Sequence, residues 1–147
     1  MRQDNRLSRV LHALLHLHQM KGPATSELIA GMLHTNASVV RRTMGGLREA
    51  GIVNATKGHG GGWQLARPLA EITLLEIYAA LGSPTLFAIG IDAEETSCLL
   101  ARAANQATTE ALEASRRQFE DALRNVSVLD IAAGWNADMA HCAPRAG

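Results

Sequence analysis

The chain has 147 residues and no net charge at neutral pH, with 47% hydrophobic and 19% charged residues. This balance fits one folded domain, or a small domain with an appended oligomerisation element, and excludes extended disorder. No apolar run reaches the roughly 18 residues of a membrane helix. The N-terminus has no apolar signal-peptide segment, so we expect a cytoplasmic protein without a membrane partner. Cys98 and Cys142 form no CxxC motif, which fits a reducing compartment better than a disulfide scaffold.

The zero net charge conceals an uneven distribution along the chain. Residues 1–67 hold nine Lys and Arg against three acidic residues, a surplus of six positive charges. Residues 68–147 hold five Lys and Arg against eleven acidic residues, a surplus of six negative charges. A basic half joined to an acidic half indicates that one half meets a polyanion, although chance segregation would give the same pattern.

Helical periodicity and capping residues predict three helices in the first fifty residues. The first is an amphipathic helix over residues 4–20. Thr25 or Ser26 caps the second, and Asn36 caps a third that continues to Ala50. Two helices joined by a short turn, the second of them basic near its start, form the helix-turn-helix pattern.

Glycines mark a predicted hairpin and an interruption of the third helix. Two β-prone runs, residues 52–56 and 63–66, flank a glycine-rich turn at 57–62 and predict a β-hairpin, the wing. A phosphate-binding loop is the alternative for such glycines, but no Gly-Lys-Ser/Thr motif and no helix follow. Gly45-Gly46 lies inside the third helix at a cost of ~1 kcal/mol per glycine. Close packing against a neighbouring helix or against DNA backbone would each explain this pair.

The second half of the chain predicts one long helix between shorter elements. A capping box opens a helix over residues 73–81, and a second capping box at 127–130 opens a short last helix. The long helix, without Gly or Pro, covers about 97–124. The expected fold is mainly α with a small β-hairpin. Its parts are a winged helix-turn-helix domain (1–82), a loop (83–96), a dimerisation helix with a short terminal helix (97–136) and a flexible tail (137–147).

Three stretches of sequence together resemble one family of regulators. They are LREAGIV at residues 47–53, KGHGGGWQLARP at 57–68 and EITLLEI at 71–77. The combination is similar to the Rrf-type winged-helix regulators, which include the iron–sulfur-cluster regulator, the nitric-oxide-sensing repressor and the cysteine-metabolism repressor of bacteria. The resemblance covers about residues 5–133.

The resemblance implies a homodimer that places two winged heads in adjacent major grooves of a palindromic DNA site. The sequence supports a dimer independently, because the long helix carries more apolar surface than one small domain covers. A helix folded back on its own domain is the alternative. The apolar residues are Leu99, Leu100, Ala103, Ala104, Ala107, Ala111, Leu112, Phe119 and Leu123.

The third helix carries the predicted base contacts, because a recognition helix presents its N-terminal residues to the DNA. These residues are Asn36, Ser38, Arg41 and Arg42, and the family's contact positions fall on the same places. Either Arg41 or Arg42 would pair with guanine, worth ~1–3 kcal/mol of discrimination, with the other on phosphate. Two solvated arginines on an exposed face are the alternative.

Four further residues are predicted to contact DNA around this helix. Lys57 and His59 lie at the wing, where the resemblance implies a basic residue in the minor groove, usually arginine rather than lysine. A narrow groove has a negative potential that would also attract Lys57. Thr25 and Ser26, at the start of the second helix, would contact phosphate through hydroxyls and backbone N–H groups.

The cysteines do not match the iron–sulfur site that many members of this family carry. That site needs three cysteines before and at the start of the long helix, and only Cys98 matches one of them. We therefore expect no cluster and no other cofactor. Cys98 could sense oxidants at the start of a helix, alone or by a disulfide with Cys142, or it is a small inert hydrophobic residue.

A histidine pair offers a possible metal chelate, which the sequence does not favour. His12 and His16 are four residues apart and share a helix face, whereas His18 lies on another face. No acidic residue or cysteine completes a ligand set nearby. Ordinary surface histidines are the preferred interpretation, and no metal site is expected.

The sequence therefore predicts a sequence-specific DNA-binding transcriptional regulator, for which repression is the preferred role and activation is the alternative. Its expected partners are double-stranded DNA, a second copy of the chain and an unidentified small effector. One alternative is a winged helix that binds another protein instead of DNA. A second alternative is a thiol-based redox regulator that uses Cys98. An enzyme is disfavoured, because the sequence offers no nucleophile–base pair, paired carboxylates or cofactor fingerprint.

Overall fold

The structure is a computed structural model that describes residues 3–94 and 97–135. It confirms the predicted mainly α fold with a winged helix-turn-helix and a long C-terminal helix. The predicted tail from residue 137 and Cys142 lie outside the described residues. In chain order the elements are α1 (Arg6–Gln19), α2 (Ser26–Met32), α3 (Ala37–Glu49), β1 (Val53–Thr56), β2 (Gly62–Leu65), the 3-10 helix η1 (Leu69–Glu71), α4 (Leu74–Ala80), α5 (Leu99–Arg124) and α6 (Val128–Trp135).

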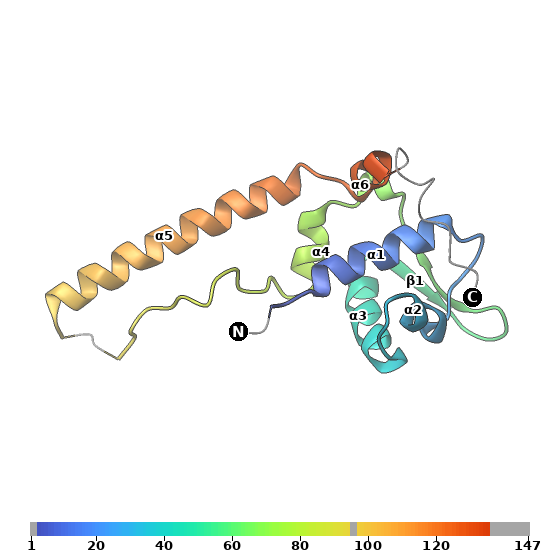
Figure 1. The fold of residues 1–147 in the computed structure, drawn as a ribbon, viewed down its shortest axis with the longest axis horizontal. Coiled ribbons are helices and arrows are strands. Elements are labelled where there is room, and N and C mark those ends of the chain that lie inside the picture. Colours follow the sequence, from blue (N-terminus) through green and yellow to red (C-terminus); the bar gives the residue numbers. More distant parts are fainter. Residues whose placement is uncertain (1–2, 95–96, 136–147) are drawn as a thin grey trace.

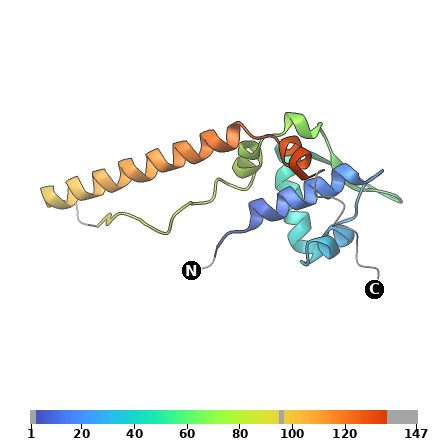
Figure 2. The ribbon, with the colours of Figure 1, turned by 45° about the horizontal axis from the view of Figure 1, so that its top comes forward.

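The molecule consists of a head and a projecting arm (Figures 1 and 2). The head contains α1 to α4, the hairpin and α6. The arm is α5, which extends away from the head with residues 83–94 running alongside it. Asn105 of α5 donates a hydrogen bond to the backbone carbonyl of Asp92, 2.6 Å away, which ties this segment to the helix. A helix of 26 residues is about 39 Å long.

Aliphatic side chains form the core of the head. Leu14 of α1, Ile29 of α2, Met44 and Leu47 of α3 and Ile77 of α4 are all fully buried. Because these residues meet at the centre, α1 and the two helices of the helix-turn-helix, α2 and α3, are fixed relative to α4. The scarcity of aromatic residues is thus matched by a core built from Leu, Ile, Val and Met.

The last helix returns to the head, although a 26-residue arm separates it from the rest of the head in sequence. Val128 is fully buried in the head core, and its backbone N–H donates to the carbonyl of Ile72 at 2.9 Å. Thr73 and Ser127 form an isolated antiparallel bridge. Ser127 and Asp130 also exchange the two hydrogen bonds of the predicted capping box. The arm is therefore attached to the head at its C-terminal end by α6 as well as by α4.

The predicted helix caps are present at both helices of the helix-turn-helix. The Thr25 side chain accepts a hydrogen bond from the backbone N–H of Leu28 at 3.1 Å, and Asn36 accepts one from Val39 at 3.0 Å. Gly51 follows α3 with a φ of 74°, a left-handed conformation that glycine adopts without strain. Local chemistry thus sets where α2 and α3 begin and where α3 ends.

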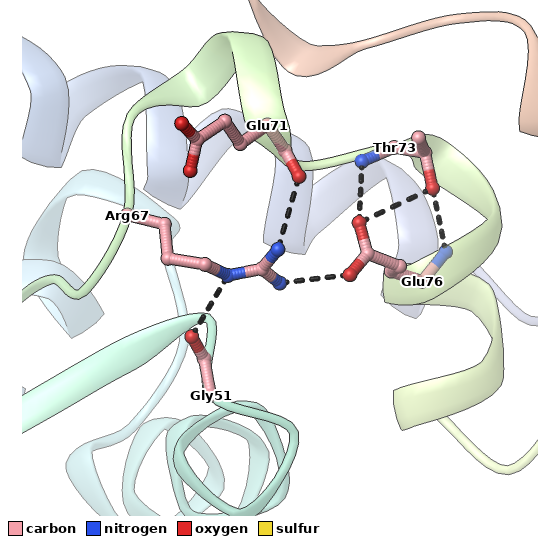
Figure 3. A network of polar contacts seen from close by, with 5 residues as sticks. All are labelled: Gly51, Arg67, Glu71, Thr73 and Glu76. Atoms are coloured by element: carbon pink, nitrogen blue, oxygen red, sulfur yellow. Dashed lines mark hydrogen bonds and ion pairs between the residues drawn. The ribbon is translucent and has the colours of Figure 1, made fainter.

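Arg67 connects the end of α3 to the start of α4 (Figure 3). Its guanidinium donates to the backbone carbonyls of Gly51 and Glu71 and to the carboxylate of Glu76, at 3.2, 3.0 and 2.8 Å. The second carboxylate oxygen of Glu76 accepts from the backbone N–H of Thr73, which completes the predicted capping box. Partial burial raises the pKa of Glu76, but the hydrogen bonds from Thr73 and Arg67 outweigh it and hold that pKa below its ordinary value.

Replacing Glu76 by Gln is expected to lower the free energy of unfolding by about 1–2 kcal/mol at pH 7, because a charge-assisted hydrogen bond becomes a neutral one. Since the pKa of Glu76 is lowered in the folded state, this contribution is complete above the ordinary pKa of 4.5 and disappears as the pH falls further. Urea denaturation at pH 7 and pH 3.5 measures it. Glu71→Gln is the control, because Arg67 contacts only the main-chain carbonyl of Glu71. Equal losses from the two variants would contradict the assigned role.

Candidate nucleic-acid interface

The exposed face of α3 carries the basic residues predicted to read DNA. Arg41 and Arg42 are both exposed, and Ser38 is exposed in the first turn. Arg41 pairs with Glu27 of α2 at 3.3 Å, an ion pair whose side chains are 54% and 70% exposed and which is therefore weak. Arg42 makes no ion pair with any residue in the described part of the chain. Of the two arginines, Arg42 is thus available for DNA without breaking an existing contact.

The wing is joined directly to the start of α2. The backbones of Ala24 and Trp63 exchange two hydrogen bonds, each of 2.8 Å, and the Trp63 indole N–H donates to the Ser26 hydroxyl at 2.9 Å. These contacts form an isolated antiparallel bridge between the residue before Thr25 and β2. They fix the wing relative to the helix-turn-helix, so that α2, α3 and the hairpin lie together at one end of the head (Figure 1).

Gly62 is the residue that permits this close approach. Its φ is 150°, and a Cβ atom placed on it would lie 2.5 Å from the carbonyl oxygen of Ala24. β1 and β2 pair antiparallel from Val53 opposite Leu65 to Thr56 opposite Gly62, so Gly62 begins the second strand. The side-chain hydroxyl of Thr56 accepts a hydrogen bond from the backbone N–H of Gly62 at 3.2 Å. Glycine fits this position because its φ is positive and the approach of the Ala24 carbonyl leaves no room for a Cβ atom.

The predicted wing contacts lie on the exposed tip of the hairpin. Lys57 and His59 are exposed, and they alternate with Gly58 and Gly60, whose φ angles are 86° and 72°. These left-handed positions turn the chain sharply and leave the two side chains at the tip. The predicted wing residues are therefore accessible at the end of the hairpin.

The two residues at the start of α2 differ in what they offer to a phosphate. Thr25 is exposed, but its side-chain oxygen already accepts the capping hydrogen bond. Ser26 is only 8% exposed, and Trp63 donates to its hydroxyl. Because the Ser26 side chain is buried, we expect Ser26 to contact phosphate through its backbone N–H rather than through its hydroxyl. The sequence predicted neither the Trp63 contact nor the pairing of Glu27 with Arg41, since both depend on residues distant along the chain.

The two glycines inside α3 have different surroundings. A Cβ on Gly46 would lie 3.4 Å from the backbone carbonyl oxygen of Ala80, at the short end of ordinary van der Waals contact, so Gly46 lies where α3 packs against α4. A Cβ on Gly45 would meet nothing within 4 Å. Gly45 lies one turn after Arg41 on the exposed face, where the protein itself does not require a glycine. Of the two explanations for the pair, helix packing therefore applies to Gly46 and not to Gly45.

The region where an iron–sulfur cluster would lie holds one thiol. Cys98 is exposed at the N-cap of α5, and residues 83–97 contain no other cysteine. No group of three or more His, Cys, Asp or Glu able to hold a metal occurs among residues 3–94 and 97–135. This donor set does not fit a cluster held by three thiolates.

A cleft beside the same loop offers room for a small molecule at the other end of α5. It has a volume of about 530 Å³ and lies between the start of α1, α4, the first residues of the loop and α5. Tyr78 and Phe119 line it and meet edge to face at 5.4 Å. Leu7 and Phe87 supply further apolar surface, and Asp4 supplies a charge.

Comparison with known proteins identifies the family. The sequence model of the Rrf2 family, described as an iron-dependent transcriptional regulator, matches residues 3–134. The chain belongs to the Rrf2 family. It is 32% identical to YwnA of Bacillus subtilis (strain 168), named as an HTH-type transcriptional regulator, over 87% of this chain and 95% of that protein. The Rrf2 family members are DNA-binding transcription regulators, so the resemblance given by the sequence is confirmed.

Solved structures show the same fold as this Rrf2 protein. A transcriptional regulator from Lactobacillus plantarum superimposes with a TM-score of 0.73 at 24% identity, over 94% of this chain and 91% of its own. CymR, the global cysteine regulator of B. subtilis, gives a TM-score of 0.65 at 21% identity, over 90% and 97%. No helix in the described part of the chain is long and apolar enough to span a membrane.

Proposed function

We propose that this Rrf2 protein is a cytoplasmic, sequence-specific repressor that binds a palindromic DNA site as a homodimer. The observation that carries the proposal is the exposed pair Arg41 and Arg42 on α3. This helix packs against α2, and the start of α2 is fixed to the wing by the contacts between Ala24 and Trp63. Asn36, Ser38, Arg41 and Arg42 contact bases and phosphates from α3. Lys57 and His59 contact the minor groove, while Thr25 and the backbone N–H of Ser26 contact phosphate.

The arm supports the dimer. Leu99 and Leu100 are 74% and 82% exposed at the far end of α5, and Leu123 is the buried residue of this helix. An apolar helix face of this length is expected to be covered in solution, and pairing with α5 of a second copy covers it. A small effector would bind in the cleft lined by Tyr78 and Phe119 and alter the relation of arm to head.

A titration of DNA fragments from the region upstream of the protein's own gene, repeated at several salt concentrations, tests the proposal. We expect the logarithm of the affinity to fall steeply and linearly with the logarithm of salt concentration, because several phosphates are neutralised. A flat response or no DNA binding, together with recovery of a protein partner, would favour an interaction module instead. Running the titration with reduced and oxidised protein tests the redox alternative at Cys98.

Gly45→Ala is expected to separate protein stability from DNA binding. The substitution should raise the free energy of unfolding by ~1 kcal/mol, because alanine is the better helix former and the added Cβ meets nothing. If Gly45 lies against the DNA backbone, the same variant loses at least tenfold in affinity. Gly31→Ala in α2, whose added Cβ also meets nothing, is the control and should keep full affinity. Unchanged affinity in Gly45→Ala would place Gly45 away from DNA.

Glu27→Gln is expected to tighten DNA binding by up to about fivefold, because it removes a negative charge near phosphate and releases Arg41. Fluorescence anisotropy with specific and unrelated DNA measures both affinities. Glu49→Gln, at the C-terminal end of α3 and also exposed, is the matched control. Weaker binding by Glu27→Gln would instead mean that Glu27 holds Arg41 in the orientation that DNA requires.

A further inference from the structure

Two histidines on α1 converge outside the DNA interface. The Nε2 atoms of His12 and His16 lie 2.8 Å apart, and their ring centroids are 4.6 Å apart. The four-residue spacing alone left these side chains as ordinary surface histidines. The distance adds that the two rings turn their Nε2 atoms toward each other and share a hydrogen bond, in which one ring donates and the other accepts. Two neutral rings can place only one proton between these nitrogens.

We propose that His12 and His16 together bind one divalent transition-metal ion through their Nε2 atoms. His12 is exposed and His16 is half-buried, so the ion would approach from solvent. Since no third His, Cys, Asp or Glu joins the pair among the described residues, water completes the coordination. Imidazole nitrogens are ligands that Cu²⁺, Ni²⁺ and Zn²⁺ all accept.

The separation of the nitrogens favours one coordination geometry. An ion about 2.05 Å from each nitrogen would make an N–metal–N angle of about 86° at the 2.8 Å separation. That angle is close to the 90° between neighbouring ligands in the tetragonal sites of Cu²⁺ and Ni²⁺. A tetrahedral Zn²⁺ site would need the nitrogens about 3.3 Å apart, farther than they lie in the structure. We therefore expect Cu²⁺ and Ni²⁺ to bind more tightly than Zn²⁺.

The surroundings of the pair limit its affinity. Arg9 precedes His12 by three residues on the same helix face, and its positive charge opposes a bound cation. With two protein ligands and this charge nearby, we expect micromolar rather than nanomolar affinity.

Titration of Ni²⁺ into the full chain, stripped of metal by a chelator, tests the site by isothermal calorimetry at pH 7.5. Ni²⁺ is the probe because it does not oxidise the two thiols. We expect one ion per chain, weaker binding of Zn²⁺, and a rise in melting temperature with added Ni²⁺ because the ion clamps one turn of α1. His12→Asn and His16→Asn should each weaken Ni²⁺ binding at least tenfold.

His18→Asn is the matched control, since His18 lies on the same helix but on another face and should leave Ni²⁺ binding unchanged. His12→Asn is the decisive variant, because the exposed position tolerates asparagine without loss of the fold, as circular dichroism would verify. Ni²⁺ binding by a folded His12→Asn variant with the affinity of the unmodified chain would overturn the site. So would equal losses in His12→Asn and His18→Asn. Neither result depends on DNA binding.

Discussion

Gly62→Ala is expected to lower the free energy of unfolding by about 3 kcal/mol or more, through backbone strain and loss of the hydrogen bonds between Ala24 and Trp63. The added Cβ would lie 2.5 and 2.6 Å from the carbonyl oxygen and carbon of Ala24, and 3.0 Å from the backbone nitrogen of Thr25. Neither strand can move aside without breaking the two 2.8 Å hydrogen bonds. The melting temperature should therefore fall by about 6–12 °C.

Thermal denaturation followed by circular dichroism at 222 nm measures this effect. Gly31→Ala is the control, because Gly31 lies in α2, its φ is negative and an added Cβ meets nothing within 4 Å. It should match or slightly exceed the stability of the unmodified chain. Well below its melting temperature, Gly62→Ala should also bind DNA more weakly, since the wing is no longer fixed beside α2. A melting temperature unchanged within 2 °C would show that the segment at Ala24 is not held against Gly62.

Arg42→Ala is expected to weaken the free energy of specific DNA binding by about 1–3 kcal/mol for each half-site of the operator that a dimer binds. Arg42 is the arginine of the pair that makes no ion pair within the described residues, so it can reach a guanine without first leaving a partner. Its loss should weaken binding to the operator far more than binding to unrelated DNA. Arg41→Ala should weaken both about equally if Arg41 contacts phosphate.

Selection of bound sequences from random DNA, followed by affinity measurements with the selected site and with scrambled DNA, checks this prediction. Arg48→Ala removes the same charge from the last turn of α3, where Arg48 is exposed, and serves as the control. It should change the dependence on salt only slightly. If Arg42→Ala and Arg48→Ala lose the same affinity for both DNAs, α3 contributes charge rather than base recognition. The reverse pattern for Arg41 and Arg42 would exchange their roles.

Local chemistry made the head predictable from sequence. Thr25 and Asn36 cap their helices as expected, and the capping box of Thr73 and Glu76 is present, because these hydrogen bonds join residues three apart. The identity of the family followed from the same compact motifs. The prediction therefore succeeded where sequence neighbours are also structural neighbours.

Contacts between distant residues could not be predicted in the same way. The hydrogen bond from Trp63 to Ser26 spans 37 residues, and the ion pair of Arg41 with Glu27 spans 14. No local pattern encodes either of them. His12 and His16 are an intermediate case. Their spacing in sequence placed both on one helix face, but it did not predict that their Nε2 atoms lie 2.8 Å apart.

The attachment of the arm to the head has a consequence for the spacing of DNA half-sites that a dimer would accept. Because Val128 is buried in the head and Phe119 packs on Tyr78, the arm meets the head through two separate contacts rather than a single hinge. In the proposed dimer, the angle between arm and head sets the distance between the two recognition helices. A substitution that weakens the packing of Val128 should then leave recognition of each half-site unchanged. It should allow the dimer to bind operators with a wider range of spacings between the half-sites.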